Sequence, residues 1–332
     1  MRIINYTVLI YFLIVFQIAN ANNREFNEWL ILFKQKAIKN GISKNTVESV
    51  MNKANFLPKV IKYDRYQPEF YEDTKTYITK RSNKLRVKNA TILYNNNKKL
   101  IDSVEQKFSV EKELLLSLMG IETNYGKHLG KMDIISSLAT LAFDKRRSVF
   151  FSNELLTLLR LIDIKLVDQS VLYGSWAGAY GNFQFMPTTI KNYALDFDNN
   201  STIQLKELND SFASAANYIN KIGWNRDQPC FFKVELKKNI SKKYLNTSAK
   251  KLINKKKLIY FENYIKNFQK IEPYKDSLVA IITPDKDIIP NIGDYSPAYI
   301  VFKNYDLILK WNRSLRFALA VCTLKNKIKN EL

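Results

Sequence analysis

Histidine and cysteine, the residues that most often bind transition metals, are scarce in this chain. The 332 residues include one histidine, His128, and two cysteines, Cys230 and Cys322. A structural zinc site takes four ligands, mostly of these two types, and the sequence has neither a Cys-x-x-Cys pair nor a Cys/His cluster. It therefore excludes such a zinc centre. The cysteines permit one disulfide in an oxidising compartment or two free thiols, and the sequence leaves both open.

Acidic residues are fewer than basic ones, and the sequence lacks the motifs of nucleic-acid-binding proteins and of hydrolases with a nucleophile elbow. The chain has 31 Asp and Glu against 52 Lys and Arg, a formal charge of +21, which attracts polyanions. It contains no recognised nucleic-acid-binding motif, so nucleic acid is not the expected partner. The segment Gly174-Ser175-Trp176-Ala177-Gly178 lacks the Gly-x-Ser-x-Gly spacing of a hydrolase nucleophile elbow, and the only histidine lies in an expected loop.

The N-terminal segment has the pattern of a secretory signal. Arg2 precedes an apolar stretch over residues 8–16, and Ala19-Asn20-Ala21 offers small residues at a cleavage site. The stretch is shorter than the roughly 20 residues of a spanning helix, so an uncleaved anchor is the minor alternative. No cysteine lies near the junction, which excludes lipid attachment to a new N-terminal cysteine. We expect an exported protein whose charge meets envelope polymers or an anionic membrane surface.

The rest of the chain is long enough for two or three subdomains, and its class is α+β, mainly α. Three segments rich in β-branched and aromatic residues read as strands, namely residues 230–236, 277–282 and 298–302. No internal repeat is found. The predicted division is a signal peptide at 1–21, an N-terminal helical region at 22–100, a core region with the strongest motifs at 101–228, a small β subdomain at 229–304 and a C-terminal helix at 305–332.

One carboxylate, Glu122, interrupts an apolar helical stripe. At roughly 100° per residue, Leu115, Leu118 and Glu122 project in nearly the same direction. The carboxyl is therefore expected to look inward, where burial raises its pKa and makes it a general acid near neutral pH. Gly126 is expected to end the helix. A Glu at a helix end that turns out to water is the alternative, and spacing alone does not separate the two.

Oxygen-bearing side chains alternate along the segment that begins at residue 196. Asp196, Asp198, Asn200 and Thr202 have the spacing of an EF-hand calcium loop, with Glu207 at loop position twelve. Ser201 occupies the position where such loops usually carry glycine. Turns rich in Asp and Asn are also common surface loops, so by itself this pattern is only a weak indication of calcium.

Several motifs combine into a family resemblance. They are Ile-Glu-Thr-Asn-Tyr-Gly at 121–126, Ser-Leu-Ala-Thr-Leu-Ala-Phe at 137–143, Arg146-Arg147, Gly-Ser-Trp-Ala-Gly-Ala at 174–179, Gln-Phe-Met-Pro at 184–187, Asn217-Tyr218 and Gly223-Trp224. Together they resemble the membrane-bound lytic transglycosylase B family of bacterial cell-wall enzymes. Weaker matches at 64–70 and 311–314 extend the likeness over nearly all of the chain after the signal. It implies a lysozyme-like helical core with an accessory helical region and a small β subdomain.

The resemblance also implies an activity. Such enzymes cleave the β-1,4 bond between N-acetylmuramic acid and N-acetylglucosamine in peptidoglycan and leave a 1,6-anhydro ring, without consuming water. Glu122 matches the family's sole catalytic acid/base. The implied setting is the periplasm, with glycan strands as substrate, other cell-wall enzymes as partners and no organic cofactor.

Six further residues are assigned to the substrate by the same resemblance. Ser175 and Asn312 would orient the carboxyl and the sugar's acetamido group. Gln184 and Tyr77 would donate hydrogen bonds along the cleft. Trp311 and Phe317 would stack on sugar rings. A turn role for Ser175 and a core position for Phe317 are the alternatives. Trp311 stands where the family is expected to carry Tyr, and Asn182-Phe183 replaces an expected Tyr-Gly pair.

The family's calcium loop falls at the same place as the alternating oxygens. Its last acidic ligand lies nearer Asp210, which could instead cap a helix that starts at Ser211. The resemblance therefore implies a structural Ca²⁺, since sugar cleavage needs no Lewis acid here.

Two other functions compete with this interpretation. A muramidase that uses water would need a second carboxylate, and the candidates are Asp133, Asp144 and Glu154. Asp144 is more typical of a helix cap or an ion pair, and Glu154 is expected to be structural as well. The neighbouring Arg146 and Arg147 are expected to hold a carboxylate or the peptide part of the substrate. The other competitor is a non-catalytic glycan-binding protein of the envelope, against which the intact Glu122 argues.

Overall fold

The computed structural model describes residues 23–67, 71–168, 172–286, 288–293 and 295–332. The predicted signal peptide, and residues 68–70 of the weaker family match, lie outside these described residues. Backbone contacts divide the chain into two compact units. Unit 1 holds the described residues up to Arg65, with Leu129–Asn192 and Ser201–Ile203; unit 2 holds Tyr66–His128, Tyr193–Asn200 and Gln204–Leu332. The five-part division proposed from the sequence stays a prediction. Within the described part of the chain, no helix has both the length and the hydropathy needed to cross a bilayer.

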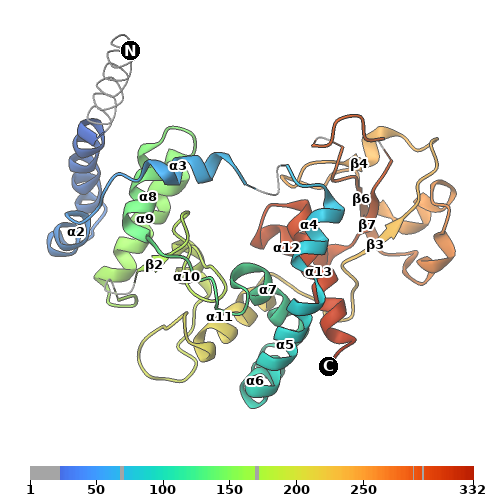
Figure 1. Cartoon of the computed structure of the whole chain (residues 1–332), viewed down its shortest axis with the longest axis horizontal. Helices are drawn as coiled ribbons and strands as arrows, with labels where there is room; N and C mark the ends of the chain where they lie inside the picture. The colour runs from blue at the N-terminus through green and yellow to red at the C-terminus, as the bar shows by residue number, and fades with distance from the viewer. Residues whose placement is uncertain (1–22, 68–70, 169–171, 287, 294) are drawn as a thin grey trace, which may run out of the picture. The chain divides into compact units, whose positions relative to one another are not determined.

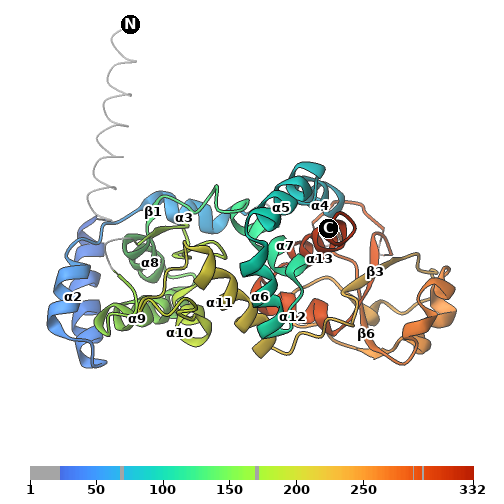
Figure 2. The ribbon, with the colours of Figure 1, turned by 90° about the horizontal axis from the view of Figure 1, so that it is seen from below.

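Unit 1 is built mainly of helices around one buried helix. Residues 23–39 are helical, and the later helices are α2 (Lys44–Met51), α3 (Pro58–Arg65), α8 (Ile134–Phe143), α9 (Ser148–Asp163) and α10 (Pro187–Tyr193). Every residue of α8 from Ile134 to Ala142 is buried, as expected for a helix that is apolar all round. In both ribbon views α8 and α9 lie side by side (Figures 1 and 2). A short antiparallel pair, β1 (Met132–Asp133) with β2 (Tyr173–Gly174), precedes the glycine-rich turn.

Unit 2 also has an apolar helix at its centre. Its helices are α4 (Thr74–Arg81), α5 (Lys84–Asn96), α6 (Lys98–Phe108), α7 (Lys112–Thr123), α11 (Leu208–Lys221), α12 (Lys303–Trp311) and α13 (Leu315–Lys329). α7 and α13 pack along one another (Figures 1 and 2), and Leu114, Leu115, Leu116 and Leu118 have no exposed surface. This core holds the last turn of α7, which carries Glu122, in place.

A small sheet completes unit 2. Its strands follow the order β3 (Phe231–Val234), β7 (Ala298–Val301), β6 (Leu278–Ile282) and β4 (Leu245–Asn246), and β5 (Lys256–Lys257) also pairs with β6. All pairings are antiparallel except that of β4 with β6. The three strands expected from the sequence are confirmed. β4 and β5 were not expected, because two residues are too few to show a strand period.

Cys230 and Cys322 form a disulfide, which decides between the two alternatives that the sequence left open. The bond joins the residue before β3 to the middle of α13, and the two Cα atoms lie 6.2 Å apart. That separation is normal for a disulfide. The sheet is thereby linked covalently to a core helix of the same unit.

A buried ion pair adds a second link at the start of α13. Arg316 Nη2 lies 2.7 Å from Asp285 Oδ1 and also donates to the carbonyl oxygen of Pro284. The backbone N–H of Thr74, at the start of α4, donates to the same carboxylate at 3.0 Å. This charged pair connects α4, α13 and the segment after β6, and removing one partner would leave a buried charge without compensation.

Candidate active site

The helix that carries Glu122 ends earlier than the sequence suggested. α7 stops at Thr123, and Asn124 adopts a left-handed conformation with φ of 50°. Its N–H donates to the carbonyl oxygens of Met119 and Gly120. The expectation that Gly126 ends the helix is wrong, because Asn tolerates this backbone conformation better than most residues. Glu122 therefore occupies the last turn of α7.

The sequence allowed either a buried Glu122 carboxyl or one that turns out to water, and the side chain lies between these two environments. Leu115 and Leu118, on the same face of α7, are fully buried, whereas Glu122 is only partly buried. The carboxyl thus lies at the edge of the apolar core rather than inside it. Part of the Glu122 side chain is therefore exposed, while the core fixes the helix that carries it.

Trp311, the last residue of α12, contacts Glu122 directly. Its indole Nε1 donates a hydrogen bond of 2.9 Å to Glu122 Oε1. Tyr218 of α11 stacks on the indole, with ring centroids 5.1 Å apart and planes 17° apart. Tyr193 stacks on Tyr218 in turn, at 4.2 Å and 20°. We call Tyr193, Tyr218 and Trp311 the aromatic stack.

The middle ring of the aromatic stack has a further contact. The Tyr218 hydroxyl donates to the carbonyl oxygen of Lys310, the residue before Trp311, at 3.1 Å. Burial, with a smaller contribution from Tyr193, raises the pKa of Tyr218 to about 12, so this hydroxyl keeps its proton near neutral pH. Tyr218 belongs to a motif of the family resemblance, but its contact with Trp311 had no signal in the sequence, and neither did the place of Tyr193.

A second group of residues supports the last turn of α7 from α5. The guanidinium of Arg86 donates to the carbonyl oxygen of Gly120, and the hydroxyl of Tyr125 donates to the carbonyl oxygen of Arg86 at 2.8 Å. Burial lowers the pKa of Arg86 and raises that of Tyr125. A Cβ on Gly120 would lie 2.5 Å from the Tyr125 hydroxyl oxygen, so a larger residue would displace the Tyr125 side chain.

Three other predicted substrate residues also belong to unit 2. Asn312 follows α12 and is partly buried, which is compatible with its predicted role. Tyr77 is 4% exposed and faces the guanidinium of Arg81, 3.5 Å from its ring centroid; its role on the glycan stays a prediction. Phe317 is 3% exposed inside α13. The predicted stacking of Phe317 on a sugar ring is contradicted by this burial, and the core alternative holds.

Ser175 and Gln184 belong to unit 1 and organise the glycine-rich turn there. The Ser175 hydroxyl accepts hydrogen bonds from the N–H groups of Ala177 at 3.2 Å and Ala179 at 2.9 Å, which is the turn role named as its alternative. Gln184 has φ of 51°, and its side-chain amide donates to the carbonyl oxygen of Gly181 at 2.8 Å. A contact of either residue with substrate stays a prediction.

Each rival carboxylate has a structural partner in unit 1. Asp133 caps α8 through the N–H of Ser136, and Asp144 forms an ion pair with Arg65 at 2.8 Å. Glu154 accepts from the N–H and the hydroxyl of Thr188 at 2.9 and 2.7 Å, and burial raises its pKa.

The arginine pair next to Asp144 is also engaged within the protein. Arg146 and Arg147 both pair with the buried Asp64, at 2.6 and 3.0 Å. They therefore hold a carboxylate, as expected, and it is one of the protein's own.

The predicted metal loop brings three carboxylates together in unit 2. Oxygen atoms of Asp196, Asp198 and Asp210 all lie within 4.8 Å of one another. Asp210 is buried and accepts from the N–H groups of Phe197 at 2.8 Å and Gln204 at 2.7 Å, so it ties the loop to α11.

Three details of the loop differ from the sequence prediction. α11 begins at Leu208, so Asp210 lies in its first turn and does not cap a helix starting at Ser211. Among the described residues, Glu207 is not part of the acidic group, and it stands instead at the N-cap of α11. Ser201 replaces the usual glycine because it adopts the left-handed conformation itself, with φ of 70°.

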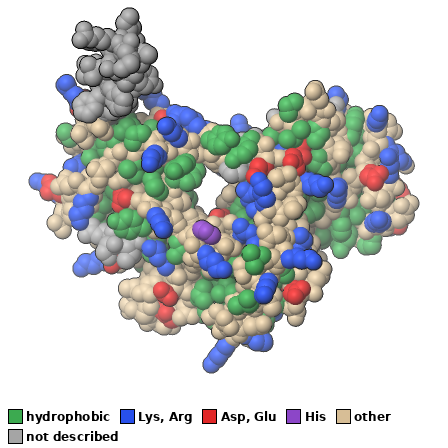
Figure 3. All heavy atoms as spheres, viewed as in Figure 1, with side chains coloured by type: hydrophobic (Ala, Val, Ile, Leu, Met, Phe, Trp, Pro, Cys, Tyr) green, Lys and Arg blue, Asp and Glu red, His purple; other side chains and the backbone are tan. Residues whose placement is uncertain are grey.

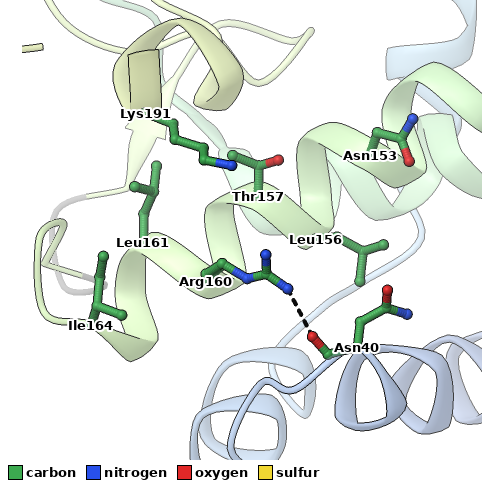
Figure 4. Close-up of a pocket in the computed structure, with 8 residues that line it drawn as sticks. All are labelled: Asn40, Asn153, Leu156, Thr157, Arg160, Leu161, Ile164 and Lys191. Carbon is green, nitrogen blue, oxygen red and sulfur yellow. Dashed lines mark hydrogen bonds between the residues drawn. The ribbon is translucent and has the colours of Figure 1, made fainter. Parts of the chain in front are cut away.

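Unit 1 has a surface pocket of about 240 Å³. The residues that line it are Asn40, Asn153, Leu156, Thr157, Arg160, Leu161, Ile164 and Lys191. Figure 4 shows them, with the Arg160 guanidinium donating to the carbonyl oxygen of Asn40 at 2.7 Å. The described lining includes no carboxylate, so this pocket offers no acid for glycoside cleavage.

Comparisons with known proteins identify the family of the chain. The family described as the transglycosylase SLT domain matches residues 25–326. The chain belongs to this family. Membrane-bound lytic murein transglycosylase B from Escherichia coli (strain K12) is 37% identical over 139 residues, which make up 42% of this chain and 38% of that relative. The match thus spans well under half of the relative's length.

Solved structures extend the likeness to more than nine-tenths of the chain. SltB3 from Pseudomonas aeruginosa in complex with NAG-NAM-pentapeptide is 30% identical, with a TM-score of 0.77 over 92% of this chain and 79% of that chain. The Escherichia coli lytic transglycosylase Slt35 in complex with calcium is 24% identical, with a TM-score of 0.73 over 94% of each chain. The family resemblance and the lysozyme-like, mainly α fold predicted from the sequence are confirmed.

Proposed function

We propose that this SLT-domain protein is a peptidoglycan lytic transglycosylase. The observation that carries the proposal is Glu122, a partly buried carboxylate at the end of a core helix, held by the indole N–H of Trp311 at 2.9 Å. The rival carboxylates Asp133, Asp144 and Glu154 are engaged in a cap, an ion pair and a hydroxyl contact. A single candidate acid among these four carboxylates suits a reaction in which the substrate supplies the nucleophile.

The chemistry we propose uses Glu122 twice. As an acid it protonates the glycosidic oxygen when the bond from the muramoyl anomeric carbon to that oxygen breaks. As a carboxylate it then takes the proton from the C6 hydroxyl, whose oxygen forms the new bond to the anomeric carbon and closes the 1,6-anhydro ring. The carboxyl ends the cycle protonated, so no second carboxylate and no water are needed.

The substrate is proposed to be the glycan strand of peptidoglycan in the periplasm. SltB3, a 30% identical neighbour, was crystallised with NAG-NAM-pentapeptide. The surplus of positive charge is compatible with an anionic envelope. Lys and Arg side chains are scattered over the face drawn in Figure 3 rather than gathered in one patch. This distribution supports a general attraction more than a discrete second binding site.

Mass analysis of products from purified sacculi tests the reaction type. We expect muropeptides with 1,6-anhydro ends, each lighter by one water than the product of hydrolysis. Reducing ends instead would show a muramidase. Sacculi that bind the protein but release no muropeptide would support the non-catalytic alternative, and either result would overturn the proposal.

We also propose that the loop of Asp196, Asp198 and Asp210 binds Ca²⁺ in a structural role. The three carboxylates supply hard oxygen ligands, which calcium prefers, and each Asp210 oxygen keeps a lone pair beyond its one backbone hydrogen bond. Asn200, Thr202 and Glu207 stay predicted ligands. A bound ion would offset the repulsion among the three carboxylates and join the loop to α11.

Calcium should therefore raise the melting temperature. Preferential binding to the folded state contributes about 2.7 kcal/mol at a calcium concentration 100 times Kd, which amounts to several degrees for a domain of this size. The double variant Asp196→Asn, Asp198→Asn should lose this response. The matched control Asp227→Asn, Asp276→Asn removes two exposed carboxylates elsewhere and should keep it. Equal calcium shifts in all three proteins, read by differential scanning calorimetry, would remove the loop as the site.

A further inference from the structure

The contact between Trp311 and Glu122 differs chemically from the one that a tyrosine could make. An indole N–H only donates, whereas a phenol hydroxyl both donates and accepts. Glu122 Oε1 is therefore the acceptor at 2.9 Å whatever the protonation state of the carboxyl. In the protonated acid, the carbonyl-type oxygen is the better acceptor. The proton is thus placed on the other oxygen, Oε2.

We propose that Trp311 is a positioning residue for Glu122, which rests on the proposed function of Glu122 as the acid. The indole holds Oε1 and so fixes the direction in which the carboxyl delivers and recovers the proton. Trp311 does this through Glu122 and not as a sugar-stacking platform, the role that the sequence resemblance suggested. One face of the indole is covered by Tyr218 at 5.1 Å, which supports a positioning role over a stacking one.

The rest of the aromatic stack restricts the indole. Tyr218 lies nearly parallel to Trp311 and Tyr193 nearly parallel to Tyr218, with planes 17° and 20° apart. The Tyr218 hydroxyl binds the carbonyl oxygen of Lys310, so α11 also fixes the backbone next to Trp311. The side-chain amide of Asn217 donates to the carbonyl oxygen of Tyr193 at 2.8 Å and holds the outer ring. Rotation of the indole away from Glu122 would break both its hydrogen bond to the carboxyl and its stacking on Tyr218.

The variant Trp311→Phe distinguishes the contribution of the indole N–H from that of the aromatic ring. It keeps an aromatic side chain next to Tyr218 but removes the donor, so Glu122 should sample unproductive rotamers. We expect kcat on a soluble peptidoglycan glycan to fall about 10–100-fold, in line with loss of one hydrogen bond to a charged group, while KM changes less than about twofold. The variant Trp311→Tyr returns a donor and should recover part of kcat. Trp29→Phe, in the aromatic packing of helix 23–39, is the matched control and should leave both constants unchanged.

A measurement without turnover tests the same contact. In ¹⁵N-labelled protein, the indole N–H resonance that disappears in Trp311→Phe should shift when Glu122 is changed to Gln, because its acceptor changes from a carboxylate to a neutral amide. If Trp311→Phe folds poorly, the Trp311→Tyr protein also lacks this indole and assigns the same resonance.

The outcomes separate the inference from the function on which it rests. Wild-type kcat in Trp311→Phe, a loss confined to KM, or an unmoved indole resonance would each overturn the positioning role while Glu122 remained the acid. High activity of Glu122→Gln would instead overturn the proposed function. A kcat loss in Trp311→Phe with partial recovery in Trp311→Tyr and none in Trp29→Phe is the result expected.

Discussion

The Glu122→Gln variant should fold and still bind sacculi, but it should release almost no muropeptide from them. The amide has the shape of the carboxyl and keeps an oxygen that can accept from Trp311, whose N–H lies 2.9 Å from Oε1 in the native protein. It cannot protonate the leaving oxygen or take the proton of the C6 hydroxyl. Loss of positioned acid and base catalysis lowers the rate by at least ~10²–10⁴-fold.

The rate of soluble muropeptide release, measured beside binding to sacculi, checks this expectation. Glu113→Gln is the matched control, because it makes the same change in the first turn of the same helix. It should leave release unchanged. Near-normal turnover by Glu122→Gln would remove Glu122 as the acid, and equal losses in both variants would point to damage to α7 instead.

Loss of the disulfide should produce the largest change in stability. The bond between Cys230 and Cys322 closes a loop with a sequence separation of 92, and loop-closure entropy for a loop of that length gives about 4–5 kcal/mol, with measured losses of native disulfides at about 2–5 kcal/mol. Cys230→Ala, Cys322→Ala should therefore lower the urea midpoint of unfolding. Activity of the still-folded variant should persist, because neither cysteine contacts Glu122, Trp311 or Tyr218 in any interaction described above.

Reductant provides the control for this second prediction. It should lower the urea midpoint of the wild-type protein to that of the double variant and should leave the variant unchanged. Coincident unfolding curves for the oxidised wild type and the variant would show that the bond contributes nothing to folding. A response of the variant to reductant would show an effect unrelated to the disulfide.

Much of the fold could be predicted because its signals are local. The apolar run from Leu114 to Met119 predicts a core helix, and the β-branched segments that became β3, β6 and β7 have the composition of strands. Errors arose where the choice between neighbouring residues depends on backbone detail. Asn124, not Gly126, ends α7, since both can adopt the left-handed conformation.

The site was harder to predict than the fold. Glu122 stood out because a carboxylate in an apolar stripe is unusual, and Asp196 and Asp198 stood out through their alternate spacing. The burial of Phe317 could not be told from a role on the substrate, because an aromatic residue suits both the core and a sugar cleft. Asp210 was one of two choices for the last acidic residue of the loop, and the start of α11 at Leu208 brings it, rather than Glu207, to Asp196 and Asp198.

By itself the sequence determined the helical class, the family resemblance, the candidate acid and the spacing of the acidic loop, because each rests on residues that lie close together in the chain. Only the tertiary structure decided that Trp311 donates to Glu122, since 189 positions separate the two residues. It also decided that Tyr218 and Tyr193 stack behind Trp311 and that Cys230 bonds to Cys322. These contacts depend on how α7, α11, α12 and α13 pack, and such packing follows from the summed burial of many side chains rather than from any local pattern.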